Sequence, residues 1–426
     1  MQLHKILVYI FFALCAVLCF TPLWISSQNR LYDFCLKTKT ALKPVQQSEQ
    51  IKQLDLGAGE HLVLDRYSGD RLFFTRQINE LDAKAVFYVP ELLSEIPQHS
   101  QGRVFASISN RHFPILIKPV PQEKARFYAL FNSPSETVFL NSILLHPQFT
   151  KECHVPEVEY FDFPKAAFPG ESINLSRNTT AAVLGQYTDS DGKTRKLPLL
   201  YRYSDGFLPS ASLYASLDFY NADLHSITVK PGKYLSFNSI NGQKISIPVD
   251  KDCCIYIPFA GKRQNEENRI YLETVEKSHE THSLNSKYLF ISDITPSADN
   301  LTATPFESAY SKTGCEVWAL NSIITKNFIR ECPLYLKLIF LFVLISIVEL
   351  NFYIKPMWLK NLFYVLYLCA LILVQGLLWI YRGIIPFFWP LLFTAAVTWL
   401  VQFFCENFTF KTPQTVLESE FPAQEN

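Results

Sequence analysis

Four long apolar runs stand out in the pattern of hydrophobic and polar positions along the chain. Each run is close to the roughly 20 residues that an α-helix needs to cross the hydrocarbon layer of a membrane. A helix satisfies its own backbone hydrogen bonds inside lipid, so the pattern predicts four transmembrane helices. The runs cover residues 6–25, 334–354, 362–381 and 384–404.

A cleaved signal peptide is the alternative interpretation of the first run. Its apolar stretch is longer than the roughly 7–15 residues of a signal-peptide core, and no small-x-small cleavage site follows it. We therefore expect residues 1–26 to remain as an anchor, residues 333–410 to hold the other three spans, and residues 411–426 to form a short cytoplasmic tail. Lys and Arg flank both sides of the spans, but a very short N-terminus before a long domain favours cytoplasmic termini.

The pattern between the anchors, over residues 27–332, alternates between strand-like and helix-like stretches. The order strand, helix, strand over residues 51–91 predicts a right-handed βαβ unit, and Asn238–Gly242 predicts a hairpin turn. The sequence thus favours a mixed-sheet α/β domain tethered to four transmembrane α-helices. We expect strands at 51–56, 83–91, 234–237, 244–249, 254–258 and 287–292, and helices at 70–81, 208–224 and 315–329.

Charge supports this division of the chain. Residues 1–26 and 333–410 hold 7 charged side chains in 104 residues, whereas the other 322 residues hold 71. The second density is ordinary for a soluble domain, so the low overall charge belongs to the apolar runs. The net charge is zero, which gives no electrostatic basis for binding nucleic acid.

Several short segments of the domain carry a resemblance to a known family. Arg30-Leu-Tyr-Asp33 follows the first apolar run, Leu208-Pro-Ser210 precedes a predicted helix, and Ile247-Pro-Val-Asp250 is followed by Tyr256 and Gly261. The segment 288–324 continues with a hydrophobic strand, an Asp, a Thr-Pro pair and a Gly-x-Glu at the start of a helix. Its matching positions are Asp299, Thr304, Pro305, Gly314 and Glu316.

In this order, and with one apolar run before the domain and three after it, these segments resemble the type-2 CHASE domain, an extracytoplasmic sensory domain of bacterial signalling proteins. Two departures are clear. Trp318 and Leu320 stand where the family usually has His and Asn, and the family's Trp-Pro-x-x-Arg segment is missing around Arg66–Thr75. Family members usually continue into a cytoplasmic output domain, whereas residues 411–426 are too few to bury a core.

The resemblance implies a receptor-type sensory protein in the bacterial inner membrane, multi-pass, with its large domain facing the periplasm. Without an output domain in this sequence, it would act through a signalling protein of the membrane or cytoplasm. Its expected partners are that protein and the lipid bilayer, with a homodimer as a further alternative. A structural or scaffolding envelope protein that kept the fold without sensing is the alternative function.

Acidic residues near strand ends are the candidates for ligand binding. Ligands commonly bind beyond the carboxyl ends of parallel strands, and Asp293 and Asp299 follow the strand predicted at 287–292. Together with Glu316 they form the candidate ligand-binding set, with Asp250 and Asp252 as further positions to inspect. The alternative is that such residues only stabilise turns.

No catalytic, cofactor or strong metal motif is present. The chain has no GxxxxGK[ST], GxGxxG or GxSxG sequence, so we expect neither an enzyme nor a cofactor. His279-x-x-His282 and Cys153-His154 near His146 lack a second matching ligand pair, so no metal is expected. Six cysteines of the domain could form disulfides of unknown pairing or be small buried side chains: Cys35, Cys153, Cys253, Cys254, Cys315 and Cys332.

Overall fold

The computed structural model divides the chain into two compact units. One comprises Met1–Tyr32 and Cys332–Asn426, and the other comprises Asp33–Glu331, close to the predicted 27–332. The residues that the structure describes are 2–19, 21, 24–56, 84–88, 126–131, 145, 147–149, 180–184, 187–203, 206–262, 269–270, 287–294, 301–354 and 356–407.

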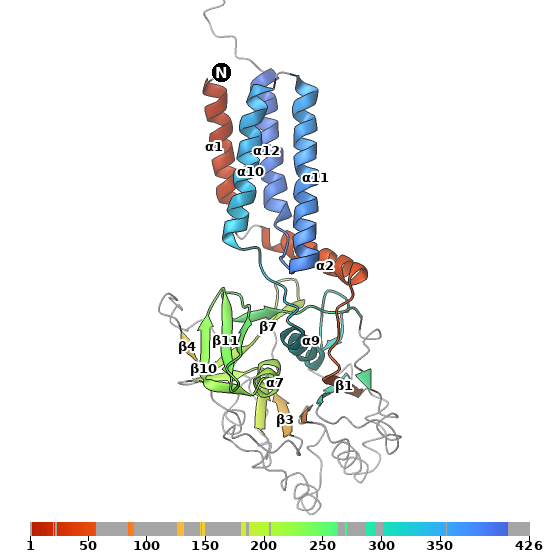
Figure 1. The fold of residues 1–426 in the computed structure, drawn as a ribbon. Coiled ribbons are helices and arrows are strands. Elements are labelled where there is room, and N and C mark those ends of the chain that lie inside the picture. The colour runs from red at the N-terminus through yellow and green to blue at the C-terminus, as the bar shows by residue number, and fades with distance from the viewer. Residues whose placement is uncertain are drawn as a thin grey trace, which may run out of the picture. The chain divides into compact units, whose positions relative to one another are not determined.

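The first unit is built from helices that lie side by side (Figure 1). The runs predicted at 334–354, 362–381 and 384–404 are largely helical, whereas the run predicted at 6–25 is helical only as far as Leu18. Helix α12 contacts the other three helices. Two of them, α10 and α11, are long and apolar enough to cross a membrane, whereas α1 and α12 contain the shorter apolar stretches Ile6–Leu18 and Phe388–Phe404. The bounds are α1 Gln2–Leu18, α10 Leu334–Tyr353, α11 Met357–Arg382 and α12 Phe388–Asn407.

This helical unit is apolar outside and partly polar inside. Large side chains such as Phe342, which is 70% exposed, cover its outer surface. Inside, the Tyr364 hydroxyl donates to Oε1 of Gln402 at 3.2 Å, and Nε1 of Trp399 donates to Oδ1 of Asn361 at 3.0 Å. Both bonds join α11 to α12, which is how polar side chains hold helices together in an apolar solvent.

Helix α2, Ile25–Leu42, follows α1 and was not expected from the sequence. Its polar residues surround most of the helix, so no apolar stripe marks it. The buried side is formed by Tyr32, Asp33, Cys35, Leu36 and Lys39, two of which are charged. Hydrophobic periodicity detects helices whose buried face is wholly apolar, whereas this face also carries Asp33 and Lys39.

A six-stranded parallel sheet forms the centre of the second unit. Its order is β14–β1–β15–β2–β3–β5, and every recorded pairing in it is parallel. The strands predicted at 51–56 and 287–292 are confirmed, and the strand predicted at 83–91 is confirmed over Ala85–Tyr88. Residues 89–91 and the helix predicted at 70–81 lie outside the described residues. The bounds are β1 Ile51–Leu56, β2 Ala85–Tyr88, β3 Arg126–Phe131, β5 Thr180–Val183, β14 Arg269–Ile270 and β15 Tyr288–Asp293.

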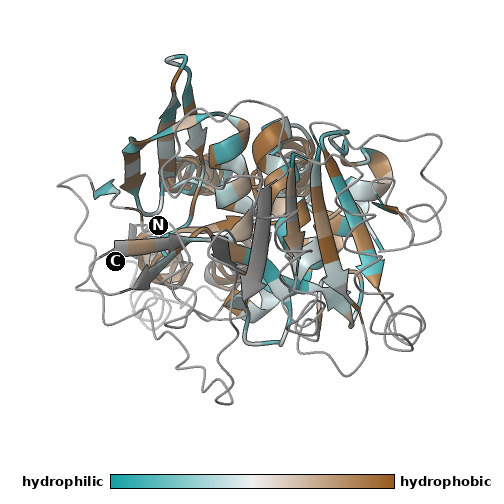
Figure 2. Cartoon of the chain, turned by 90° about the horizontal axis from the view of Figure 1, so that it is seen from below, coloured by the Kyte–Doolittle hydropathy of each residue, from teal (hydrophilic) through white to brown (hydrophobic). Residues whose placement is uncertain are grey.

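The interior strand β15 lies between β1 and β2, so the chain returns to the middle of the sheet after β3, β5 and β14 have joined it. The stacked rings of Phe87 and Phe290, with centroids 4.4 Å apart, fill one side of this pairing. Figure 2 shows hydrophobic residues along the strands and hydrophilic ones at turns. Strands β2 (AVFY) and β15 (YLFISD) are nearly continuous apolar runs, as is typical of strands buried on both faces, which is why their positions could be predicted.

A second sheet corrects one prediction. The helix predicted over 208–224 is shorter: β9 ends at Pro209, Ser210 caps the helix, and α7 covers only Ala211–Phe219. Asn221 has a φ of 47°, which ends the helix, and β10 starts at Ala222. The residues after it pair with β11 instead, in a four-stranded sheet of β12 Lys244–Ile247, β11 Tyr234–Ser239, β10 Ala222–Lys230 and β4 Gln148–Phe149.

The predicted hairpin is confirmed within this sheet, because β11 and β12 pair antiparallel across a turn that ends at Gly242.

The helix predicted at 315–329 is also confirmed, with different ends. Helix α9 covers Lys312–Thr325, and Lys326 adopts a left-handed conformation with a φ of 55° that stops it. The described residues also form three small sheets: β13 Cys254–Tyr256 with β7 Thr194–Pro198 and β6 Tyr187–Thr188; β8 Leu200–Tyr203 with β9 Gly206–Pro209; and β16 Leu301–Thr302 with β17 Tyr310–Ser311.

Candidate functional site

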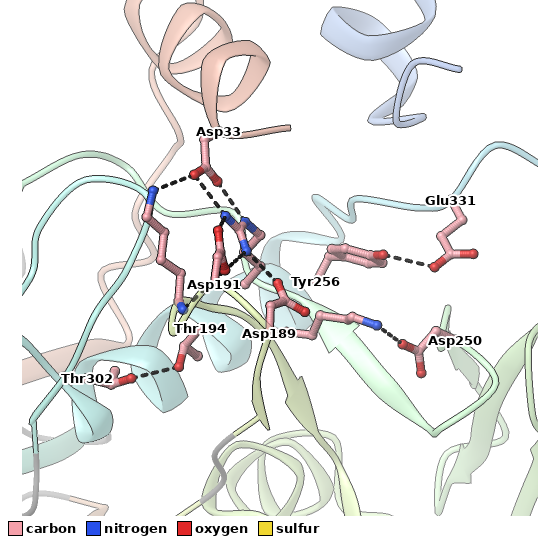
Figure 3. A network of polar contacts seen from close by, with 11 residues as sticks. Asp33, Asp189, Asp191, Thr194, Asp250, Tyr256, Thr302 and Glu331 are labelled. Atoms are coloured by element: carbon pink, nitrogen blue, oxygen red, sulfur yellow. Dashed lines mark hydrogen bonds and ion pairs between the residues drawn. The ribbon is translucent and has the colours of Figure 1, made fainter. Parts of the chain in front are cut away.

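In the described part of the second unit, a heavily charged site is built on the central strand of the β13–β7–β6 sheet (Figure 3). Successive residues of a strand point to opposite faces. Arg195 and Lys196 of β7 therefore face opposite ways, and each reaches a different set of carboxylates.

On one face, the buried Arg195 uses all five of its N–H groups on three carboxylates. Its Nε and Nη2 donate to the two oxygens of Asp33 at 2.7 and 2.9 Å, and its Nη1 donates to Asp189 at 2.6 Å. Both terminal nitrogens also donate to Asp191, at 2.8 and 2.6 Å. Nζ of Lys193 donates to Asp33 at 2.8 Å. Such a planar, forked guanidinium fixes its partners in orientation as well as position.

The charges of this group shift its titration. Burial acts to lower the pKa of Arg195, but the hydrogen bonds that it donates to the three carboxylates outweigh this effect and raise the pKa above its ordinary value. The hydrogen bond from Arg195 lowers the pKa of Asp191 to about 2. Three carboxylates face two cations, Arg195 and Lys193, so the group holds together only while the buried guanidinium is in place.

On the other face, Lys196 joins β7 to the loop before β13. Its Nζ donates to Asp250 at 2.7 Å and lies 4.8 Å from the ring centroid of Tyr187 and 5.4 Å from that of Tyr256. Burial acts to lower the pKa of Lys196, but the charge of Asp250 outweighs it and raises the pKa. The hydroxyl of Tyr256, on β13, donates to Glu331 at 2.9 Å, and Tyr256 also forms an antiparallel bridge with Ile329.

The small sheet therefore contacts the two ends of its unit. Asp33 is the first residue of the second unit and lies on α2, which follows α1 in the chain; Glu331 is its last residue, three positions before α10 begins. Arg195 holds the first of these residues and Tyr256 the second. Chemically the arrangement offers a rigid, fully hydrogen-bonded connection, and every labelled carboxylate in Figure 3 is engaged within it.

Of the three ligand candidates predicted from the sequence, Glu316 is the one whose side chain the structure describes. Asp293 ends β15 opposite Leu56 of β1, and nothing is described of its side chain. Asp299 lies outside the described residues. Of the further positions, Asp250 accepts hydrogen bonds from the backbone N–H groups of Asp252 and Cys254, a turn-stabilising role in addition to its pair with Lys196.

Glu316 is buried in α9, where its Oε2 accepts a hydrogen bond from the backbone N–H of Ser212 at 2.8 Å. Ser212 is in the first turn of α7, whose N–H groups lack intrahelical partners and which favours negative charge. The glycine of the Gly-x-Glu segment also has a structural explanation. A Cβ on Gly314 would lie 2.7 Å from the ring of Tyr310, so only glycine fits that approach.

A polar group at the carboxyl end of the large sheet was not recognised from the sequence. Oδ1 of Asp55 on β1 accepts a hydrogen bond from Nε2 of Gln53 at 2.8 Å and another from the Ser292 hydroxyl, and its carboxylate pairs with Arg269 of β14. This is the edge where parallel sheets commonly bind ligands. The sequence did contain a sign of this group, the polar residues Gln53 and Asp55 in one strand. Such a pair normally indicates the solvent-exposed face of a strand, whereas Gln53 is buried.

The described cysteines of the predicted disulfide set are buried thiols in the structure. They are Cys35, Cys253, Cys254, Cys315 and Cys332; Cys153 lies outside the described residues. Burial raises the pKa of Cys35 to about 11 and that of Cys254 well above its ordinary value. These thiols are accordingly packed as small apolar side chains.

Within the described ranges, no three His, Cys, Asp or Glu residues are grouped so that they could hold a metal ion. The weak histidine candidates at 279 and 282, and Cys153-His154, fall outside those ranges. Comparison of the chain with known protein families, with curated proteins and with solved structures found no match.

Proposed function

We propose that this chain is an integral membrane protein of receptor type, similar in plan to the type-2 CHASE family. In this proposal α1, α10, α11 and α12 cross the bacterial inner membrane, and the α/β unit faces the periplasm. The unit senses a ligand, and the helices pass its state to a partner protein. The observation that carries the proposal is the β13–β7–β6 sheet, which binds residues at both ends of the α/β unit, so a rearrangement there reaches both connections to the apolar helices.

A relay needs two states whose balance a ligand shifts. The carboxyl end of the large sheet, with Asp55, Arg269 and Ser292, is the place we assign to the ligand. It supplies both signs of charge, which suits a polar ligand better than an apolar one. The relay then acts through the connections held by Asp33 and Glu331.

The placement of the domain outside the cell predicts the outcome of a protease experiment. A protease added to spheroplasts should cut within residues 27–332 and leave the tail 411–426 intact, because the bilayer shields the cytoplasmic side. Tags on the tail and immunoblotting would report both. If the tail is cut and the domain is protected, the proposed orientation is reversed. If neither is cut in spheroplasts but both are cut after lysis, the domain lies in the cytoplasm.

The relay predicts that mild changes in the network alter the α1–α12 contact. Cys19 reports on that contact, since its buried Sγ lies 3.1 Å from Oγ1 of Thr394. We expect Lys193→Gln and Tyr256→Phe, which weaken the connections at Asp33 and Glu331, to change the rate of Cys19 alkylation by N-ethylmaleimide several-fold. Site-specific mass spectrometry on isolated membranes would measure it.

The control for that experiment is Lys244→Gln, at an exposed position of β12. It removes a charge of the same sign without touching the network and should leave the Cys19 rate unchanged. If all three variants alkylate like the unmodified protein, the network is a static support and the relay fails.

A scaffolding role is the second candidate, favoured by one observation. The positions where the family usually has His and Asn are occupied by Trp318 and Leu320, both buried, and the Trp318 indole donates to the Tyr310 hydroxyl at 2.8 Å. These residues serve the core of the domain. Crosslinking in living cells separates the two roles: reproducible recovery of a kinase, cyclase or phosphatase supports signalling, whereas recovery of envelope components alone supports scaffolding.

A further inference from the structure

The outward face of α2 combines basic and large apolar side chains. Residues spaced by three, four or seven positions share one face of a helix. Arg30, Phe34, Lys37 and Ala41 follow this spacing, and all are exposed. Phe34 is 67% exposed, and Leu42, at the flank of the same face, is equally open.

The charge of this face has one sign. Asp33 is the only acidic residue of α2, and it is buried and bound by Arg195 on the opposite side of the helix. The charged side chains exposed on α2 are therefore the cations Arg30 and Lys37, and the exposed Lys43 follows the helix directly. An exposed Phe between an Arg and a Lys, with no carboxylate on that face, complements an anionic surface with an apolar layer beneath it.

We propose that this face of α2 binds the membrane surface, with Phe34 and Leu42 at the boundary of head groups and acyl chains, and Arg30 and Lys37 on anionic phospholipid head groups. Helices with a basic polar face and exposed aromatic or leucine side chains lie in this plane. Continuity supports the bilayer as the partner, because only six residues separate α1, which ends at Leu18, from α2, which starts at Ile25. The inference rests on the proposed membrane insertion of α1.

This contact gives α2 two faces with separate tasks. The buried side is fixed to β7 through Asp33, while the outer side is held by lipid. A change in the α/β unit that moves Asp33 would then have to move α2 against the bilayer surface, which makes the anionic lipid content of the membrane a regulator of the proposed relay.

Photocrosslinking of the full chain tests the proposal. The variant Phe34→benzoylphenylalanine, reconstituted in vesicles of phosphatidylcholine with phosphatidylglycerol, should form phospholipid adducts visible by mass spectrometry. Ile240 is the matched control, because it is 60% exposed at the tip of the β11–β12 hairpin. The adduct yield at position 34 should exceed that at position 240 by about tenfold, and should fall about fivefold when Arg30→Gln and Lys37→Gln are added or phosphatidylglycerol is left out.

The outcomes separate this inference from the function on which it rests. Phe342→benzoylphenylalanine, on the outer surface of α10, reports insertion of the helices. If the variant at position 342 forms lipid adducts and the variant at position 34 forms none, the contact of α2 with the membrane is refuted but the insertion of the helices is not. A crosslink from position 34 to protein instead of lipid has the same meaning. Absence of adducts at 342 overturns the membrane placement itself. A yield at 34 that is independent of the two cations and of phosphatidylglycerol refutes the head-group interaction.

Discussion

Replacing Arg195 with methionine should lower the free energy of unfolding of the α/β unit by about 3–5 kcal/mol, the usual cost of removing one partner from a buried ion pair. Methionine fills much of the same volume, so the loss of charge dominates the effect. Asp33, Asp189 and Asp191 would be left close together with only Lys193 to compensate them. Of these, Asp33 is buried and cannot recover its water without unfolding part of the sheet.

Hydrogen exchange of the full chain in membranes would measure this loss, because the slowest backbone amides of β7 and β13 report the free energy of opening. The control is Lys193→Met, which removes a cation from the same cluster. That side chain is 37% exposed, so we expect a loss of less than about 1 kcal/mol. If both substitutions lower the free energy of unfolding equally, Arg195 stabilises the unit no more than the half-exposed Lys193 does.

A second substitution sharpens the test. Adding Asp33→Leu to Arg195→Met removes the most buried of the stranded charges, so the double variant should recover part of the stability lost by the single one. A double variant less stable than Arg195→Met would contradict the electrostatic explanation, because the loss would then come from shape rather than charge.

The elements that could be predicted from the sequence are those whose pattern matches their burial. Strand β1 begins and ends where its pattern predicts, at Ile51 and Leu56, and α10 matches the run at 334–354. Helix α1 ends at Leu18, seven residues before the end of its predicted run. The helix predicted at 208–224 failed because β10 pairs with β11 and β4 from Ala222 onward. Long-range pairing of this kind overrides a local helical pattern.

The charged network could not be predicted for a related reason. Asp33 and Arg195 are 162 positions apart, and neither stands in a motif that announces a partner. A polar residue in a short strand such as Thr194–Pro198 normally indicates a solvent-facing position, whereas Arg195 is buried. The Asp of the Arg-Leu-Tyr-Asp segment was noticed only through the family resemblance, and its contact with Arg195 gives that position a physical role.

Glu316→Ala should destabilise the α/β unit by about 2–3 kcal/mol, because it leaves the buried Ser212 N–H without its carboxylate and opens space beside α7. The loss cannot come from helix propensity, since alanine is the best helix former and Glu316 lies within α9. Glu316→Gln keeps the shape and an acceptor oxygen and loses mainly the charge at the start of α7, so we expect about 1 kcal/mol.

Exchange of the first backbone amides of α7, from Ser212 to Tyr214, is the local measurement. Glu331→Ala is the matched control, because that carboxylate makes an exposed hydrogen bond with Tyr256 and its loss should cost little. The result also decides whether Glu316 binds a ligand or only stabilises the fold. A Glu316 that serves a ligand would be a strained position, and its removal would leave stability unchanged or raise it, as happens when functional residues are replaced. A loss confined to α7 would instead make Glu316 a structural cap and leave the carboxyl end of the large sheet as the place to search for the ligand.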